Sequence, residues 1–153
     1  MDIAIRTADP TRVAALPSSG EVDFAASWNA FIPAATDQGF FGPGVQIMSV
    51  FRPNYDPETG VSGMQSYAPA ITVAADRPIG DPFTERMSPT GKYAAWTYTG
   101  PYEGLAAAWG AFVDGVKGAG HRVADREWFE IYLDDPSTTP PESLRTVLHV
   151  PVE

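Results

Sequence analysis

A carboxylate flanked by aromatic side chains stands in the segment Trp128 to Leu133. Side chains alternate between the two faces of a strand, so a strand here would place Trp128, Glu130 and Tyr132 on one face. Charged residues are mostly exposed, which makes a solvent-facing Glu130 on an edge strand the ordinary alternative. A buried Glu130 would need a cationic partner, or it would take a raised pKa and serve as a general acid or base. The residues alone leave both placements open, and they make Glu130 the leading candidate for chemistry.

Other kinds of site find little support in the sequence. The chain has 0 cysteines, which excludes disulfides and thiolate ligands. His121 and His149 are the only histidines and have no second histidine at ligand spacing, so we expect no metal site. There is no G-x-S-x-G motif, and the glycine-rich segment 39–44 lacks the lysine of a phosphate-binding loop. We therefore expect no metal and no cofactor.

The charge of the chain favours some partners over others. Acidic residues number 19 and basic residues 10, giving a net charge of −9. Such a surface repels duplex DNA and anionic membranes and attracts cations, so we expect a small-molecule ligand, no direct nucleic-acid binding and no membrane partner. The first residues lack the pattern of a signal peptide, and the longest apolar stretch, 104–113, is far short of a membrane span. We expect a cytoplasmic protein.

An internal repeat organises the chain into two halves. Three pairs of segments match at offsets of 80, 81 and 84 residues, respectively: 14–20 with 94–100, 24–31 with 105–112, and 45–48 with 129–132. The third pairing aligns Gln46 with Glu130 and Met48 with Tyr132. This alignment predicts that Gln46 and Met48 share the face of the sheet on which Glu130 lies.

Each half is predicted to form a βαββ unit. Apolar residues at positions i, i+4 and i+7 predict a helix from Phe24 in the first half and from Leu105 in the second, each ended by a glycine, Gly39 or Gly120. Strands are predicted at 12–16, 45–51, 67–74, 93–99, 128–133 and 144–150. The proline- and glycine-rich segments 52–60 and 134–141 are predicted to be loops.

These units predict the whole architecture. Neither half has enough apolar surface to fold alone, so we expect one domain over 1–153, with repeat one at about 10–75, a linker at 76–90 and repeat two at 91–153. The fold class is α+β: two βαββ units related by a pseudo-twofold axis, an antiparallel sheet, and both helices on one face. A ligand groove is expected at the seam between the halves, because small-molecule sites favour concave junctions.

Three segments of the second half resemble the GyrI-like effector-binding family. Lys92 to Tyr102 is similar to that family's strand and helix start, Trp128 to Pro136 to its Phe-Glu-Ile-Tyr-Leu strand, and Thr139 to Pro151 to its closing segment. Together these motifs are specific, whereas the first half is supported by the internal repeat. The chain is identified as a stand-alone member of the family.

The resemblance implies binding of small molecules. In that family the domain often follows a DNA-binding domain in transcription regulators that sense drugs and lipophilic cations, and single-domain members also occur. It therefore implies binding of amphipathic aromatic molecules, cationic ones among them. One alternative is a hydrolase of strained electrophiles, such as cyclopropane-bearing genotoxins. The other is a protein-binding module similar to the gyrase inhibitors, with a regulator or gyrase as partner.

The resemblance also implies a set of site residues around Glu130, which stands at the position of the family's pocket glutamate. Trp28 and Trp109, at matching repeat positions, are expected to pack the helices on the sheet and to wall the pocket. Gln46, Met48 and Tyr132 are expected to line it.

Further candidates are less central. In a hydrolase Glu130 would act with a tyrosine; Tyr67 is the named partner, and Tyr98 and Tyr132 stay open as alternatives. Phe40 is expected to belong to a lid. Val147 stands where the family often has a second acidic residue, which leaves Glu130 as the clear charge of the predicted pocket.

Overall fold

Over the described residues, 1–18 and 20–153, the computed structural model has eight strands, two α-helices and two short 3₁₀ helices. In chain order the elements are β1 (Ala4–Ala8), β2 (Arg12–Ala15), α1 (Phe24–Asp37), β3 (Ile47–Asp56), β4 (Gly60–Thr72), β5 (Thr84–Met87), β6 (Gly91–Thr99), η1 (Tyr102–Gly104), α2 (Leu105–Gly118), β7 (Trp128–Tyr132), η2 (Pro141–Ser143) and β8 (Arg145–Pro151).

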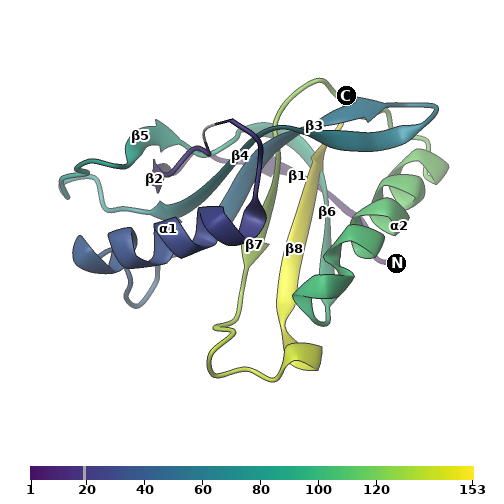
Figure 1. The fold of residues 1–153 in the computed structure, drawn as a ribbon. Helices are drawn as coiled ribbons and strands as arrows, with labels where there is room; N and C mark the ends of the chain where they lie inside the picture. The colour runs from purple at the N-terminus through teal and green to yellow at the C-terminus, as the bar shows by residue number, and fades with distance from the viewer. Residues whose placement is uncertain (19) are drawn as a thin grey trace.

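All eight strands join one antiparallel sheet in the order β1-β6-β8-β7-β3-β4-β2-β5. Both α-helices lie on the same side of this curved sheet, α1 over the β2–β4 end and α2 over the β6–β8 end (Figure 1). The predicted α+β class, the antiparallel sheet and the placement of the helices are confirmed. The strand order is the one that two βαββ units joined through β3 and β7 would give. The internal repeat itself stays a prediction.

The helices are held by apolar contacts on their sheet-facing sides. In α1 the N-cap residue Asp23 accepts a hydrogen bond from the Ala26 N–H at 3.0 Å, which satisfies a free donor of the first turn. Phe31 is fully buried against Ala14 and Ile71 of the sheet. In α2, Phe112 is buried in a separate cluster that includes strands β6 and β8. Each helix is thereby fixed over its own half of the sheet.

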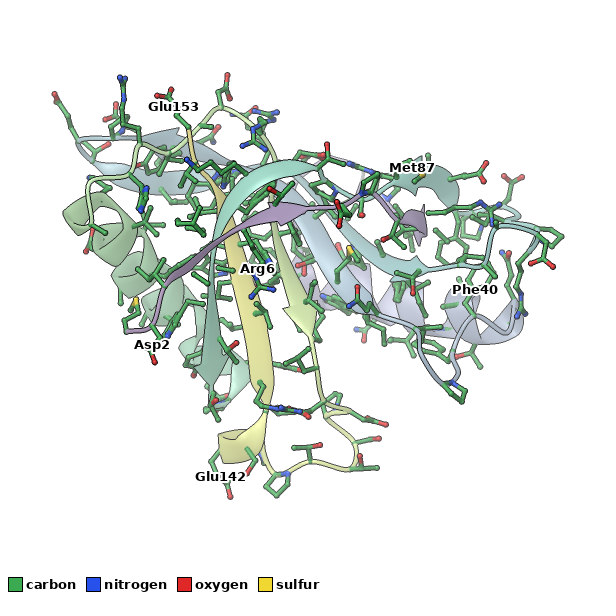
Figure 2. All side chains as sticks on the ribbon, turned by 180° about the vertical axis from the view of Figure 1, so that it is seen from behind. Asp2, Arg6, Phe40, Met87, Glu142 and Glu153 are labelled. Atoms are coloured by element: carbon green, nitrogen blue, oxygen red, sulfur yellow. The ribbon has the colours of Figure 1, made fainter. Side chains whose placement is uncertain are left out.

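The opposite, rear face of the sheet has its own apolar cluster. It contains Val13, Met48, Val50, Tyr93 and Phe129, all buried. Seen from behind in Figure 2, strand β1 crosses this side of the molecule and carries Arg6 over it. The sheet therefore separates a helix-covered front face from a rear face covered by extended chain.

One expectation about loops was wrong, and two strands were not predicted. The segment 52–60 is not a long loop, because β3 and β4 continue through it as a hairpin that turns at 57–59. Register shifts around Pro53 accommodate the proline, and Lys117 Nζ ties the tip to α2 by donating to the Pro57 carbonyl at 2.6 Å. The predicted linker contains β5, which pairs with β2. Strand β1, at the other edge of the sheet, was not predicted.

Candidate functional site

Glu130 is buried at the centre of the front face, with 7% of its surface exposed. Its Oε2 accepts a hydrogen bond from Trp109 Nε1 at 2.9 Å, and its Oε1 accepts one from the Tyr132 hydroxyl at 2.7 Å. The Ser49 hydroxyl lies 3.2 Å from the same Oε1 and 2.9 Å from the Tyr132 oxygen. The carboxylate is thus surrounded by neutral donors from β3, β7 and α2.

The pairing of the strands explains why these groups meet. Strand β7 places Trp128, Glu130 and Tyr132 on the helix side, as the alternation of its residues predicted. In the ladder between β3 and β7, Ser49 lies directly opposite Glu130. Side chains of such a pair lie on the same face, so the small hydroxyl of Ser49 sits beside the carboxylate.

Aromatic rings from both helices close over this group. The Trp28 ring of α1 contacts Tyr132 edge to face, with centroids 5.3 Å apart, and its Nε1 donates to the Tyr67 hydroxyl at 2.8 Å. The Trp109 ring of α2 lies 5.5 Å from that of Trp128. Trp28 and Trp109 are each the fifth residue of their helix, so the two helices deliver one indole each to the seam.

Burial controls the ionisation of these groups. It raises the pKa of Glu130 above its ordinary value, and the hydrogen bonds from Tyr132, Trp109 and Ser49 oppose that rise. Burial, with the charge of Glu130 as a second cause, raises the pKa of Tyr132 well above its ordinary value. Burial likewise raises the pKa of Tyr67. Both phenols therefore keep their protons at neutral pH.

Among the residues that the structure describes, the Glu130 carboxylate has no cationic partner. Five ion pairs form among the described residues, and none of them includes Glu130. An ionised carboxylate in such a place is costly even when neutral groups donate to it. A positive charge placed beside Glu130 would therefore stabilise its ionised form.

Three residues at this site were not predicted, and the first of them is Ser49, which lies opposite Glu130. Thr146 lies opposite Tyr132 in the ladder between β7 and β8 and is fully buried, and its Oγ1 has no hydrogen-bond partner in the described structure. Tyr102 of η1 contacts the Tyr132 ring edge to face at 5.8 Å. A threonine in a closing strand and a tyrosine before a helix carry no sequence signal of a site. Thr146 could have been found only from the strand pairing.

Five predicted site residues lie away from Glu130. Met48 is buried in the rear cluster, which corrects the expectation that it shares the Glu130 face. Gln46 precedes β3 and is exposed. Phe40 packs against Phe83 beyond the end of α1, on the side of the molecule away from α2 (Figure 2), and is buried rather than placed as a lid.

The remaining two of these five, Tyr98 and Val147, are on β6 and β8. Tyr98 donates to the Pro101 carbonyl at 2.9 Å and packs against Trp96. Val147 pairs with Ile131 and points away from Thr146 and Leu148, so it faces the rear of the sheet. Of the predicted set, the structure brings Glu130, Trp28, Trp109, Tyr132 and Tyr67 together at the seam.

Rings from both helices lie over the sheet at the seam. Two surface hollows, of about 300 and 330 Å³, lie elsewhere, and neither is lined by Glu130. Across the part of the chain that the structure describes, no cluster of histidine, aspartate and glutamate could hold a metal ion. None of the described helices combines the length and apolar composition needed to cross a bilayer.

A family model for the GyrI-like small molecule binding domain matches residues 1–153. The chain belongs to this family. No curated protein sequence matches it. The GyrI-like assignment therefore rests on the family model and on the fold.

Solved structures share the fold of this GyrI-like domain. The EcmrR C-terminal domain matches with a TM-score of 0.78 and 16% identity, covering 99% of this chain and 97% of that one. The structure of SAV2435 bound to tetraphenylphosphonium matches with a TM-score of 0.71 and 17% identity, covering 100% and 94%. A hydrolase from Listeria innocua matches with a TM-score of 0.60 and 15% identity, covering 99% and 91%. At these identities the likeness shows the fold alone.

Proposed function

We propose that this GyrI-like domain binds amphipathic aromatic molecules with a single positive charge at the seam between α1 and α2. The observation that carries the proposal is the buried Glu130 carboxylate, whose partners are all neutral donors. A cationic ligand would supply the missing counter-charge. The net charge of −9 adds a long-range attraction for cations and disfavours direct contact with nucleic acid.

The surrounding rings suit the apolar part of such a ligand. Trp28, Trp109, Tyr132 and Tyr102 offer ring faces and edges around the carboxylate. Each contact between a cation and a ring face contributes about 0.5–2 kcal/mol. A delocalised organic cation gains from both the rings and Glu130, whereas a small hydrated metal ion gains little from the rings.

Entry of a ligand requires the seam to open. The contact between Trp28 of α1 and Tyr132 of β7 closes the space above Glu130. We expect the ligand to replace this contact with its own ring, so that α1 and α2 keep their packing on the sheet while Trp28 changes rotamer. The fold is shared with SAV2435, which was solved bound to tetraphenylphosphonium, and this likeness supports an organic cation as the class of ligand.

The test is a calorimetric titration with tetraphenylphosphonium and with the neutral triphenylphosphine oxide. We expect Glu130→Gln to lower the affinity for the cation by about tenfold or more, equivalent to ~1.4 kcal/mol. The affinity for the neutral molecule should not change. The matched control is Glu103→Gln, which removes the same charge from an exposed side chain. Equal affinity of the cation for wild type and Glu130→Gln would overturn the proposal.

The same titration has an expected pH dependence. The Glu130 pKa is raised, so the carboxylate that pairs with the cation is lost as the pH falls through that raised pKa. Affinity for the cation should therefore decrease on acidification in wild type, and stay level in Glu130→Gln. The neutral molecule should bind independently of pH in both proteins.

A hydrolase is the second candidate, favoured by the 2.7 Å contact between the Tyr132 hydroxyl and Glu130. In this proposal Glu130 takes a proton from the attacking water while Tyr132 protonates the opened ring of a strained electrophile. The proton on Glu130 then returns to Tyr132. Tyr132 replaces Tyr67 as the partner, because the Tyr132 hydroxyl is the phenol that bonds directly to Glu130. Hydrolysis of styrene oxide that is lost in both Glu130→Gln and Tyr132→Phe would support it; unchanged product formation would exclude it.

A further inference from the structure

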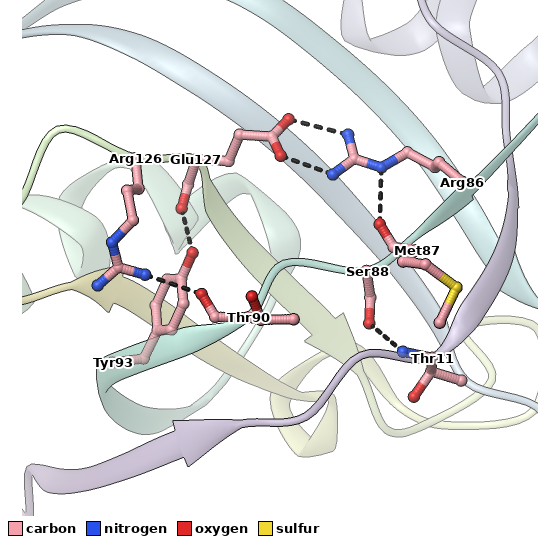
Figure 3. Close-up of polar contacts among 8 residues, drawn as sticks. All are labelled: Thr11, Arg86, Met87, Ser88, Thr90, Tyr93, Arg126 and Glu127. Carbon is pink, nitrogen blue, oxygen red and sulfur yellow. Dashed lines mark hydrogen bonds and ion pairs between the residues drawn. The ribbon is translucent and has the colours of Figure 1, made fainter.

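Away from Glu130, basic side chains line two adjoining surface hollows. Figure 3 shows Arg126 and Glu127 of the first hollow with their polar contacts. A hollow of about 300 Å³ is lined by Arg52, Pro89, Thr90, Tyr93, Arg126 and Glu127. A neighbouring hollow of about 330 Å³ shares Arg52 and Arg126 and continues to Tyr55 and Trp128. The two guanidinium groups thus stand between a polar hollow and one with aromatic walls.

Arg126 is fixed in place by backbone carbonyls. Its Nη1 donates to the Thr90 carbonyl at 2.9 Å, and its Nη2 donates to the carbonyls of Lys92 at 2.8 Å and Val152 at 3.2 Å. The guanidinium lies 5.0 Å from the centroid of the Tyr93 ring. Gly91 makes room for it, because a Cβ at this residue would come within 2.7 Å of Arg126 Nη1. A cation held this rigidly is ready to receive a ligand without further ordering.

The charge of Arg126 is not balanced by a carboxylate. Across the described residues, none of the ion pairs within 4.0 Å includes Arg126. Glu127 lines the same hollow, but its carboxylate is engaged by Arg86 through two hydrogen bonds of 2.6 and 2.9 Å (Figure 3). Both acidic neighbours of Arg126 in the sequence are thus paired with other arginines, Glu127 with Arg86 and Asp125 with Arg52.

Arg52 is held only loosely. Its Nη1 pairs with Asp125 Oδ1 at 2.7 Å, but the Asp125 side chain is 99% exposed. An ion pair with so exposed a partner contributes little, because water and salt screen it. An incoming anion can therefore replace Asp125 at small cost.

We propose that the cleft formed by these two hollows is a binding site for a small carboxylate with an apolar body. The carboxylate lies between Arg52 and Arg126. The planar fork of Arg52 matches its two oxygens once Asp125 is displaced, while Arg126, whose Nη2 hydrogens both bond carbonyls, contributes its charge and a single N–H donor. The apolar body lies in the neighbouring hollow against Tyr55 and Pro53. Each hollow, at about 300 and 330 Å³, is at the small end of the range of ligand pockets, which sets the size to a single ring or a short chain.

The test uses benzoate as the carboxylate and benzamide as its neutral counterpart, titrated into the isotopically labelled protein at low salt and followed by NMR, including the arginine Nε–H signals. We expect benzoate to give saturable shifts at Arg126 and Tyr55, and benzamide to give none. Arg52→Gln should lower the affinity for benzoate at least fivefold. Asp125→Asn should strengthen it, because Arg52 loses its competing partner.

Two controls make the result specific. Arg122→Gln removes an equal charge from an arginine that lines neither hollow and is 83% exposed, and it should bind benzoate as wild type does. Glu130→Gln should also leave benzoate binding unchanged, which separates this cleft from the seam. Arg126→Gln should abolish binding, and the Arg52 and Asp125 variants decide the matter if that protein fails to fold. Equal shifts with benzamide, or equal weakening by Arg122→Gln and Arg52→Gln, would overturn the proposal.

Discussion

The front and rear faces of the sheet each hold a charged side chain, in two different ways. On the front, Glu130 is bonded to side chains, and one of them, Trp109, belongs to a helix packed on the sheet. On the rear, Arg126 is bonded to three carbonyls of the backbone itself. Side chains can change rotamer, whereas these carbonyls are fixed by β6 and by the end of the chain. The difference indicates a seam that opens around its ligand and a cleft that is already formed.

The two faces also bury titratable groups with opposite effects on folding. Glu130 on the front has a raised pKa, caused first by burial. On the rear, burial and the nearby charge of Arg6 lower the pKa of His149 to about 4. Its ring is stacked on Phe129 with centroids 4.1 Å apart, and its Nδ1 lies 3.2 Å from the Val147 carbonyl. Acid should therefore weaken the rear face, and alkali the front.

The largest expected effect is that of acid on the rear face. The folded pKa of His149 is about 4, below its ordinary value of 6.5, so the unfolded chain takes up the proton first as the pH falls between these values. The stability that neutral His149 contributes is lost across this window, on the order of 3 kcal/mol. Urea unfolding of wild type and His149→Leu at pH 7 and pH 4 measures it, and the wild type should lose more.

His121→Leu is the control for this prediction, since His121 is the other histidine and lies outside the rear cluster. It should follow the wild type at both pH values. If His149→Leu loses as much stability in acid as the wild type does, other groups cause the loss. His149 would then not make the rear face sensitive to acid.

A smaller effect of opposite sign is expected from Glu130. Its folded pKa is raised, so the folded protein keeps the proton to higher pH, and stability falls as the pH rises from the ordinary value of 4.5 through the raised pKa. Glu130→Gln removes this loss, and its amide can still accept from Trp109. We expect the variant to be more stable than wild type at pH 8 by on the order of 1 kcal/mol, with a smaller difference at pH 4.

Chemical unfolding at both pH values measures this difference, with Glu103→Gln as the exposed control. A variant less stable than wild type at pH 8 would mean that the three donors stabilise the carboxylate by more than its burial costs. The seam would then already stabilise the Glu130 carboxylate without a ligand. The two faces would no longer differ in how they hold a charged side chain.

The sequence predicted which face of its strand Glu130 shares with Tyr132, but it left the burial of Glu130 open and did not identify Ser49 as its neighbour. Alternation along β7 correctly puts Glu130 and Tyr132 on one face, because a strand has only two faces. The repeat offset of 84 matched Gln46 to Glu130 by chemical likeness, whereas the helix offset of 81 would have matched Ser49, the residue that the ladder places opposite. The two offsets differ by an odd number, and an odd shift exchanges the faces of a strand. Met48 was therefore expected on the wrong side.

The edge strands and the rear cleft were beyond sequence reasoning for other reasons. Strands β1 and β5 have five and four residues and are mostly exposed, so neither has a clear apolar alternation. Arg126 is held by the backbone carbonyls of Thr90, Lys92 and Val152. Every residue has such a carbonyl, so the sequence does not mark the ones that bind an arginine. Only the folded chain brings these groups around one guanidinium.

The smallest expected effect concerns Thr146, whose buried Oγ1 has no partner in the described structure. A buried hydroxyl without a hydrogen bond costs about 1–3 kcal/mol, and valine has nearly the same shape without that group. Thr146→Val should therefore stabilise the unliganded protein by about 1 kcal/mol, measured by thermal unfolding. Thr146→Ser, which keeps the hydroxyl and loses the methyl group, should destabilise it. If Thr146→Val is instead destabilising, the hydroxyl has a bound water as partner, and the front face holds a second polar site beside Glu130.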